Sequence, residues 1–265
     1  HHSVKTIRER LGLNGFNEVK ESDKWNLQKD GKYYVIKNDS ALIAFTIGNG
    51  DIEEDGFKLI GAHTDSPGFR IKANPEMVSE GTYLKLNTEV YGGPILYTWF
   101  DRPLGIEGKV TLKGSSPLKP EVKLVNINKP LLIIPSLAIH MNRSVNEGLN
   151  INKQKDTLPL LSLINEKFEK DGYLLKILAE ELKVDTSDIL GFDLGLYEIE
   201  KGAIIGLNEE FISAGRLDDM WMVYAGIQAL IESKPNKSTK VMVCMDNEEI
   251  GSLTAQGANS ALLLN

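Results

Sequence analysis

The stretch "FKLIGAHTD" at residues 57–65 directs the interpretation of the whole chain. It is almost entirely apolar up to His63, and such a short run is typical of a strand buried on both faces of a mixed or parallel sheet. His63 is one of only four histidines in the chain, and Asp65 follows it two residues later. This spacing suggests a metal ligand and the carboxylate that orients it. The alternative is a histidine at a strand end that forms a hydrogen bond with its neighbour.

Two more acidic stretches occur in the second half of the chain. "RLDD" at 216–219 begins an apolar helical pattern, and "DNEE" at 246–249 follows the apolar strand pattern "STKVMVCMD". In α/β sheets, ligands bind beyond the carboxyl ends of the strands, so these stretches are expected to converge with His63. One imidazole and several carboxylates suit Zn²⁺, Mn²⁺ or Co²⁺. Taken singly, "RLDD" also fits an acidic helix start, and "DNEE" also fits a solvated loop.

The order of strand and helix patterns predicts an α/β fold in which a mixed-sheet domain is interrupted by a β-rich insert. The mixed-sheet domain is expected at residues 1–73 and 207–265, and the insert at 74–206. Residues 4–15 are predicted to form a helix, and 32–48 two strands. In the insert, apolar and polar residues alternate between Gly, Pro and Ser, which is typical of antiparallel strands.

Several segments carry more specific expectations. "NGDIEEDG" at 49–56 is predicted to be a polar loop, and the stretches around "LLSLINEKF" and "LLKILAEELKV" are predicted to be helical. "SLTAQGANSALLL", from Ser252, is expected to open a further helix. The helical pattern after Arg216 places apolar side chains on one face: Leu217, Met220, Trp221, Tyr224, Ile227, Leu230 and Ile231.

Composition argues against several classes of protein. Hydrophobic residues make up 42% and charged residues 25% of the chain, as in ordinary globular domains, and no apolar run approaches the roughly 20 residues that cross a bilayer. The net charge of −7, without a Lys/Arg cluster among aromatics, argues against nucleic-acid binding. The single cysteine, Cys244, excludes an intramolecular disulfide and a cysteine-based zinc cluster, and its apolar surroundings predict a buried, inert thiol. A reducing cytoplasm is the expected location.

Four segments, in order along the chain, carry a resemblance to a known family. They are "GAHTDSPGFRIK" (61–72), "IPSLAIHMNR" (134–143), "FISAGRLDDM" (211–220) and "MDNEEIGSLTAQGA" (245–258). Together they resemble the signature segments of the M18 metallopeptidases, the aspartyl aminopeptidase family, and the resemblance extends along essentially the whole chain. It implies a mixed-sheet α/β metallopeptidase domain interrupted by a β-rich dimerisation domain.

The resemblance implies a role for each candidate site residue. The family's centre holds two divalent metal ions, with zinc expected ahead of manganese or cobalt. His63 would bind one ion and Asp65 would orient it, while Asp218 would bridge both ions and Glu249 would bind the other. Glu248 would be the general base that takes a proton from a metal-bridging water.

The resemblance also implies a reaction and an assembly. The reaction would remove N-terminal residues from peptides, preferably Asp or Glu; a neutral-residue aminopeptidase of the same family and a non-catalytic assembly protein on the same scaffold are the alternatives. Homodimers would assemble into a larger tetrahedral oligomer, in which His140 would act in the active site of the neighbouring subunit. Family members bring a further Asp and a further His from beyond the second glutamate. The chain is therefore expected to lack the C-terminal part of its catalytic domain, and the activity would belong to the intact protein.

Overall fold

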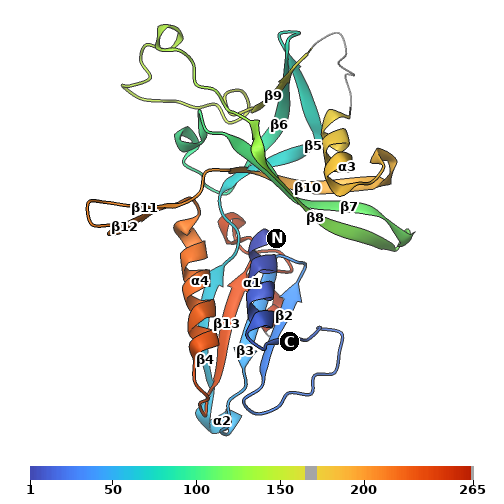
Figure 1. The fold of residues 1–265 in the computed structure, drawn as a ribbon, viewed down its shortest axis with the longest axis vertical. Helices are drawn as coiled ribbons and strands as arrows, with labels where there is room; N and C mark the ends of the chain where they lie inside the picture. The colour runs from blue at the N-terminus through green and yellow to red at the C-terminus, as the bar shows by residue number, and fades with distance from the viewer. Residues whose placement is uncertain (165–171, 264–265) are drawn as a thin grey trace. The chain divides into compact units, whose positions relative to one another are not determined.

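The computed structural model describes residues 1–164 and 172–263, which fold as two units (Figure 1). The first unit joins His1–Ser66 to Ala214–Asn265, and the second comprises Pro67–Ser213. The sequence predicts these junctions at 73/74 and 206/207, so each lies seven residues from its expected place. At the first junction the reason is that β5 (Gly68–Ser79) is one continuous strand of the second unit.

The first unit is built on a five-stranded mixed sheet with the order β1-β2-β3-β13-β4. Its strands are β1 (Asn17–Glu18), β2 (Lys32–Lys37), β3 (Ala41–Thr46), β4 (Phe57–His63) and β13 (Thr239–Met245). β3 is antiparallel to β2 and β13, whereas β4 and β13 are parallel and Met245 pairs with His63. The predicted mixed-sheet α/β fold is confirmed, and the parallel pair brings two strand ends to the same edge.

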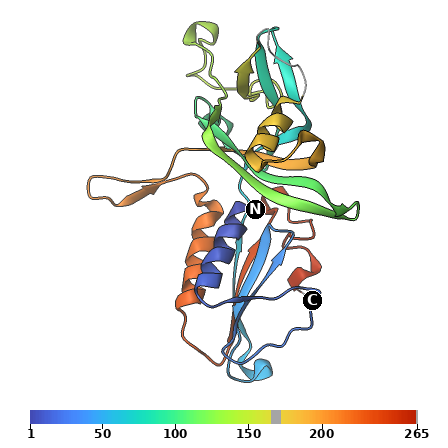
Figure 2. The same ribbon diagram turned by 45° about the vertical axis from the view of Figure 1, so that its right-hand side comes forward.

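Two helices, α1 (His2–Leu13) and α4 (Leu217–Glu232), lie together on one face of this sheet (Figures 1 and 2). They help to enclose a core of buried side chains: Val4, Ile7, Leu11, Phe16, Tyr34, Leu42, Ala44, Val223, Ile227, Leu230, Met242 and Cys244. The predicted apolar face of α4 is only partly buried, since Leu217, Trp221 and Tyr224 are exposed. The helix instead approaches the sheet at Gly226, where a Cβ atom would lie 2.3 Å from the Sδ of Met242.

Two segments depart from the sequence expectations because of the hydrogen bonds that they form. The expected loop at 49–56 contains a one-turn helix, α2 (Ile52–Asp55), whose N-cap Asp51 accepts a hydrogen bond from the Glu53 amide at 2.9 Å. Leu160–Leu163 forms strand β9 rather than a helix, because it pairs with β6 (Tyr83–Tyr91). The continuation of that expected helix, from residue 165, lies outside the described residues.

The segment after Ser252 also differs, because tight turns replace the expected helix up to a short 3₁₀ helix at Ala261–Leu263. The Asn259 amide donates to the Ser252 carbonyl at 3.2 Å, and a Cβ on Gly257 would lie 2.3 Å from that same oxygen. The chain therefore folds back on itself here, and backbone groups that a helix would use are bonded across the turns.

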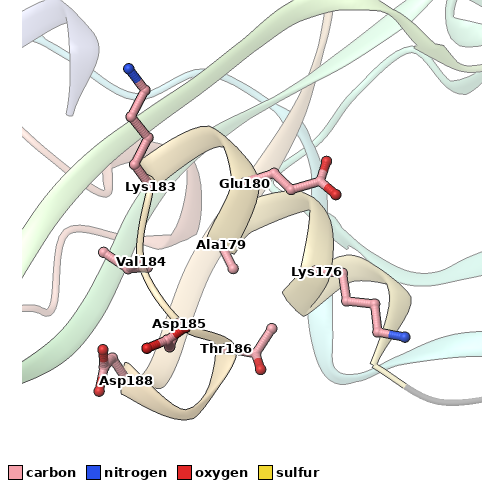
Figure 3. A pocket seen from close by; sticks show the side chains of 8 residues that line it. All are labelled: Lys176, Ala179, Glu180, Lys183, Val184, Asp185, Thr186 and Asp188. Atoms are coloured by element: carbon pink, nitrogen blue, oxygen red, sulfur yellow. The ribbon is translucent and has the colours of Figure 1, made fainter.

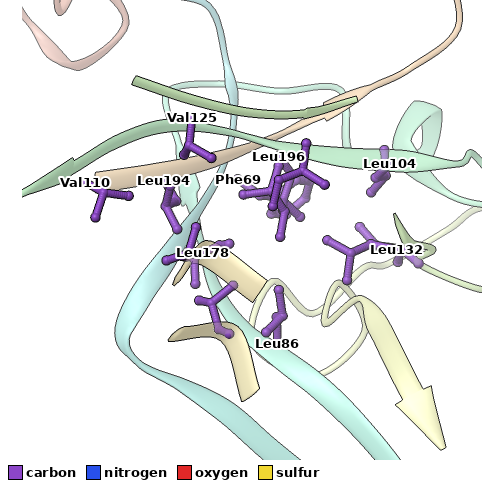
Figure 4. Close-up of a cluster of buried hydrophobic side chains, with 14 of the residues drawn as sticks. Phe69, Leu86, Leu104, Val110, Val125, Leu132, Leu178, Leu194 and Leu196 are labelled. Carbon is purple, nitrogen blue, oxygen red and sulfur yellow. The ribbon is translucent and has the colours of Figure 1, made fainter. Parts of the chain in front are cut away.

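The second unit contains an antiparallel six-stranded sheet with the order β8-β7-β10-β5-β6-β9. Its remaining strands are β7 (Leu104–Ser116), β8 (Lys119–Leu132) and β10 (Ile189–Glu198), and a separate hairpin joins β11 (Ala203–Ile205) to β12 (Phe211–Ser213). The predicted helix α3 (Tyr173–Leu182) packs Leu174 and Leu178 into the core under the sheet (Figure 4).

Short 3₁₀ helices complete both units. They are η1 (Leu96–Trp99), η2 (Ile139–Met141) and η3 (Thr186–Asp188) in the second unit, and η4 (Glu248–Ile250) and η5 (Ala261–Leu263) in the first. Within the part of the chain that the structure describes, every helix is too short or too polar to cross a membrane.

Candidate metal centre

The three acidic stretches meet where β4 and β13 end. His63 is the last residue of β4, and Thr64 donates from its amide to the carbonyl of Met245, the last residue of β13, at 2.7 Å. The Thr64 hydroxyl also donates to the Ser40 carbonyl at 2.6 Å. The two strand ends are thus fixed to each other, so "HTD" and "DNEE" leave the sheet side by side. The convergence expected from the sequence is present.

Asp65 is the buried anchor of this centre, with a side chain that is only 6% exposed. Its two carboxylate oxygens accept the backbone amides of Glu248 at 3.1 Å and Glu249 at 3.2 Å. Its Oδ1 also lies 3.4 Å from Nδ1 of His63, and its carbonyl oxygen lies 3.0 Å from the same nitrogen. One carboxylate therefore positions the imidazole and both glutamates. The sequence predicts only the first of these two tasks.

The aspartate pair at the start of α4 is the third segment of the centre, after the ends of β4 and β13. Oδ1 of Asp218 lies 3.2 Å from Nε2 of His63, and the Asp218 side chain is 86% exposed. Oδ2 of Asp219 accepts the backbone amide of His63 at 3.1 Å, and the peptide bond between the two aspartates is cis. No pattern in the sequence assigns a role to Asp219. Its position next to Asp218 was the available signal, because neighbouring carboxylates can serve different partners.

A buried polar loop supports the two glutamates. Asn247 adopts a left-handed conformation with φ of 62°, and its Oδ1 accepts the Thr254 hydroxyl at 2.7 Å and the Gln256 amide group at 3.1 Å. The Asp246 carboxylate accepts the Asn247 amide at 2.8 Å. Since Asp246 and Asn247 are both buried, these bonds fix the turn that presents Glu248 and Glu249. The sequence by itself does not indicate this role of "TAQG" at 254–257, in which Thr254 and Gln256 carry the polar side chains.

The donor atoms suit a divalent cation. His63, Glu248 and Glu249 each offer one ligand atom, and these atoms lie within 4.8 Å of one another. Asp218 lies outside that tight group, although its carboxylate contacts Nε2 of His63. An imidazole whose second nitrogen faces a buried carboxylate is a common arrangement for a metal-binding histidine. The predicted ligands His63, Asp218 and Glu249 thus lie together with Glu248 at one place.

The charges of the centre shift two pKa values upward. For His63, burial by itself lowers the pKa, but the negative charges of Asp65, Asp219 and Glu248 and the bond to the Asp65 backbone outweigh it, so the pKa is raised. The pKa of Glu249 is raised by burial first, and then by the charges of Asp65, Glu248 and Asp218. The side chains of the centre therefore concentrate negative charge, which a bound cation would offset.

Two other residues from the sequence analysis lie away from this centre. Cys244 is fully buried on β13, and burial, with a contribution from the charge of Asp219, raises its thiol pKa to about 12. This agrees with the predicted inert thiol. His140 lies exposed in η2 of the second unit, and its predicted role in a neighbouring subunit stays a prediction.

A shallow hollow in the second unit offers no comparable chemistry (Figure 3). It is open to solvent and lies at the C-terminal end of α3. Side chains of both charges surround it: Lys176, Glu180, Lys183, Asp185 and Asp188. Figure 3 shows their charged groups spread around the hollow rather than directed at a common point.

Comparisons with known proteins identify similar chains. A family model described as aminopeptidase I zinc metalloprotease (M18) matches residues 1–265. A probable M18 family aminopeptidase 2 from Clostridium novyi is 62% identical over 264 residues, which are 100% of this chain and 61% of the relative.

Two solved structures share the fold. One, described as the cryo-EM structure of the Ape4 and Nbr1 complex, has a TM-score of 0.93 and 34% identity, covering 99% of this chain and 54% of that one. The other, the S. cerevisiae mApe1 dodecamer, has a TM-score of 0.83 and 29% identity, covering 99% and 60%. The chain thus spans about three fifths of the length of the curated relative from Clostridium novyi.

Proposed function

The chain belongs to the M18 family of zinc metalloproteases, and from this membership we propose that the intact protein is a two-metal aminopeptidase. It hydrolyses the N-terminal residue of peptides. The observation that supports this proposal most strongly is the buried carboxylate of Asp65, which holds the amides of Glu248 and Glu249 and lies against His63. A solvated acidic loop would need no such anchor.

The side chains of the centre divide the chemistry between them. Two divalent cations, zinc first, would lower the pKa of a water molecule and polarise the scissile carbonyl when bound. His63, Asp218 and Glu249 are the proposed ligands. Glu248 is the proposed general base, because its exposed carboxylate can face the attacking water while its backbone stays fixed to Asp65. Glu249 is the more buried of the two glutamates, which suits a ligand that stays in place.

The proposed substrates are peptides with an N-terminal Asp or Glu, and the neutral-residue aminopeptidase is the second candidate. The chain's own net charge of −7 does not favour acidic substrates, so a local cation must offset it in the specificity pocket. The proposed assembly is a homodimer that builds a larger tetrahedral oligomer in the cytoplasm, with His140 completing the site of a neighbouring subunit. Support for an oligomer comes from the S. cerevisiae relative, which is described as a dodecamer.

Turnover and metal content together test the proposal. The intact protein is expected to cleave aspartyl-4-nitroanilide faster than leucyl-4-nitroanilide, and to lose activity on chelation and regain it with Zn²⁺, Mn²⁺ or Co²⁺. The reverse preference would favour the neutral aminopeptidase. A metal-loaded, oligomeric protein that cleaves neither compound nor a panel of N-terminal peptides would favour the non-catalytic assembly protein.

A further inference from the structure

The segment that carries His140 is held to the second unit at few points. His140 lies in η2, where the amides of Met141 and Asn142 donate to carbonyls three residues earlier. Among the residues that the structure describes, every hydrogen bond made by residues 137–153 joins groups at most four positions apart. Ile139 and Met141 are also exposed, so core packing adds little. The position of His140 therefore depends on the point at which this segment leaves the core.

Asp101 fixes that point. Its Oδ1 accepts the Ser136 amide at 2.8 Å, and its own amide donates to the Ile134 carbonyl at 2.9 Å. The bonded residues Asp101 and Ser136 lie 35 positions apart in the chain. Ser136 precedes His140 by four residues, whereas the next long-range hydrogen bond along the described chain is made by Gln154. Asp101 is therefore the tertiary anchor closest to His140.

The anchor itself has a rigid support. The register of β7 and β8 joins Leu104 to Leu132, and the side chains of Leu104, Leu132 and Ile134 are at most 3% exposed. Asp101 adopts a left-handed conformation with φ of 59°, which Asp and Asn tolerate better than most residues do. The amide and then the hydroxyl of Ser136 lower the pKa of the Asp101 carboxyl, so it stays charged at neutral pH. The Ser136 amide thus bonds to a charged acceptor, which is the stronger kind of hydrogen bond.

We propose that Asp101 is a positioning residue for the active site of the neighbouring subunit, because it fixes the start of the segment that delivers His140. This rests on the proposed role of His140 in that site. With Ser136 held, His140 reaches at most about 14 Å from the anchor, and with Ile134 as the nearest fixed residue it reaches about 21 Å. Releasing Ser136 widens the range of positions, and a misplacement of about 1 Å can cost about 10²-fold in rate.

A purely structural role for Asp101 is the alternative, since its bonds also close the turn between η1 and β7. The two roles differ in where a defect appears. A structural defect affects the subunit that carries the substitution. A positioning defect affects the active site of the partner, and only through His140.

Variants of Asp101 separate the acceptor from the backbone conformation. Asp101→Gly removes the acceptor but leaves the left-handed conformation unstrained, whereas Asp101→Asn keeps one acceptor oxygen. In the intact protein, Asp101→Gly should lower kcat/KM by about 10- to 100-fold, and Asp101→Asn should recover most of it. The matched control is Asp156→Gly. Asp156 accepts the Asn152 amide at the same 2.8 Å, but only within its own turn, so its loss should change kcat/KM by less than about twofold.

A double variant tests whether Asp101 acts through His140. If it does, adding Asp101→Gly to His140→Phe should lower kcat/KM no further than His140→Phe alone. Losses that multiply would overturn the proposal, because Asp101 would then act independently of His140. If Asp101→Gly fails to fold, Ser136→Pro, which removes the amide donor instead, should give the same result.

Subunit mixing decides between the two roles. Asp101→Gly mixed with Glu248→Gln should regain activity after exchange, because one site in each mixed dimer has Glu248 and receives a correctly held His140. Asp101→Gly mixed with His140→Phe should stay inactive, because both changes impair the same delivered segment. The opposite pattern would place Asp101 in its own subunit's site and overturn the proposal. His140→Phe mixed with Glu248→Gln tests the role of His140 by itself. Recovery there without recovery of Asp101→Gly would refute only the role of Asp101, and no recovery in either mixture would refute both roles.

Hydrogen exchange gives a measurement that needs neither metal nor turnover. In the intact protein, amides in a peptide covering residues 136–142 should exchange at least about 10-fold faster in Asp101→Gly than in wild type. Asp101→Asn and Asp156→Gly should stay close to wild type. Unchanged exchange of this peptide in Asp101→Gly would show that the Ser136 bond does not hold the segment, and would overturn the proposal.

Discussion

Replacing Asp65 with Asn tests the central feature of the metal centre. Asp65 accepts the amides of Glu248 and Glu249 and faces Nδ1 of His63, all from a buried position. An asparagine keeps one acceptor oxygen but turns an NH₂ group towards one of these donors. A hydrogen bond to a charged group contributes about 1.5–3 kcal/mol, and an unpaired buried donor costs about 1–3 kcal/mol. We therefore expect the first unit to lose about 2–4 kcal/mol of unfolding free energy.

The same substitution should weaken metal binding without removing a ligand. Losing the group that orients a metal-binding histidine commonly costs ~10- to 100-fold in affinity. Zinc affinity, measured by competition with a chromophoric chelator, should fall by that factor. The stability loss should appear as faster exchange of the buried Met242 and Cys244 amides on β13, which report opening of the first unit.

Asp193→Asn is the matched control in the second unit. Asp193 accepts a hydrogen bond from Nη1 of Arg70 at 3.0 Å, but both side chains are partly exposed. Pairs of this kind contribute roughly 0–1 kcal/mol, so this variant should change stability little and zinc affinity not at all. The reasoning about Asp65 fails if both variants shift stability equally and both keep wild-type zinc affinity.

Four further predictions concern the proposed roles. Glu248→Gln should lower turnover of the intact protein by ~10²–10⁴ with nearly unchanged metal content, because the amide cannot accept a proton; equal metal loss in Glu248→Gln and Glu249→Gln would contradict the division between base and ligand. Asp218→Asn should cost more metal than Asp65→Asn, because a bridging ligand holds both ions, and metal analysis showing the reverse order would exchange their roles. The raised pKa of Glu249 means that the stability this group contributes to the metal-free chain is present below its unfolded pKa and is lost as pH rises through the folded value. Glu249→Gln should therefore stabilise the metal-free chain at neutral pH in urea unfolding, with the gain vanishing towards pH 4; no gain at neutral pH would contradict the shift. Mixing intact His140→Phe with intact Glu248→Gln should restore activity once subunits exchange, since one site in each mixed dimer would hold both groups; proven exchange without activity would exclude a role across the interface.

The sequence by itself determined most of the strands, the helices α1, α3 and α4, and the candidate ligands His63, Asp218 and Glu249 with Glu248 beside them. The apolar runs ending at His63 and Met245 predicted two strands of a mixed α/β sheet, and the acidic stretches at their ends predicted where "HTD", "RLDD" and "DNEE" converge. These features are readable because the period of apolar residues reflects local backbone geometry, and because ligands gather at strand ends in this class of fold.

Only the tertiary structure decided what covers each surface and which partner each polar group takes. Among the described residues, β4 is as apolar as a central strand but ends the order of its sheet. Helix α4 buries the side that contains Gly226, and Leu160–Leu163 pairs as a strand. Asp65 and Asp219 accept backbone amides from residues 183 and 156 positions away. A sequence pattern shows the period and polarity of side chains. It does not show which distant backbone group a polar side chain will bond to, or which distant strand a segment will pair with. Those partners are chosen only when the sheet assembles.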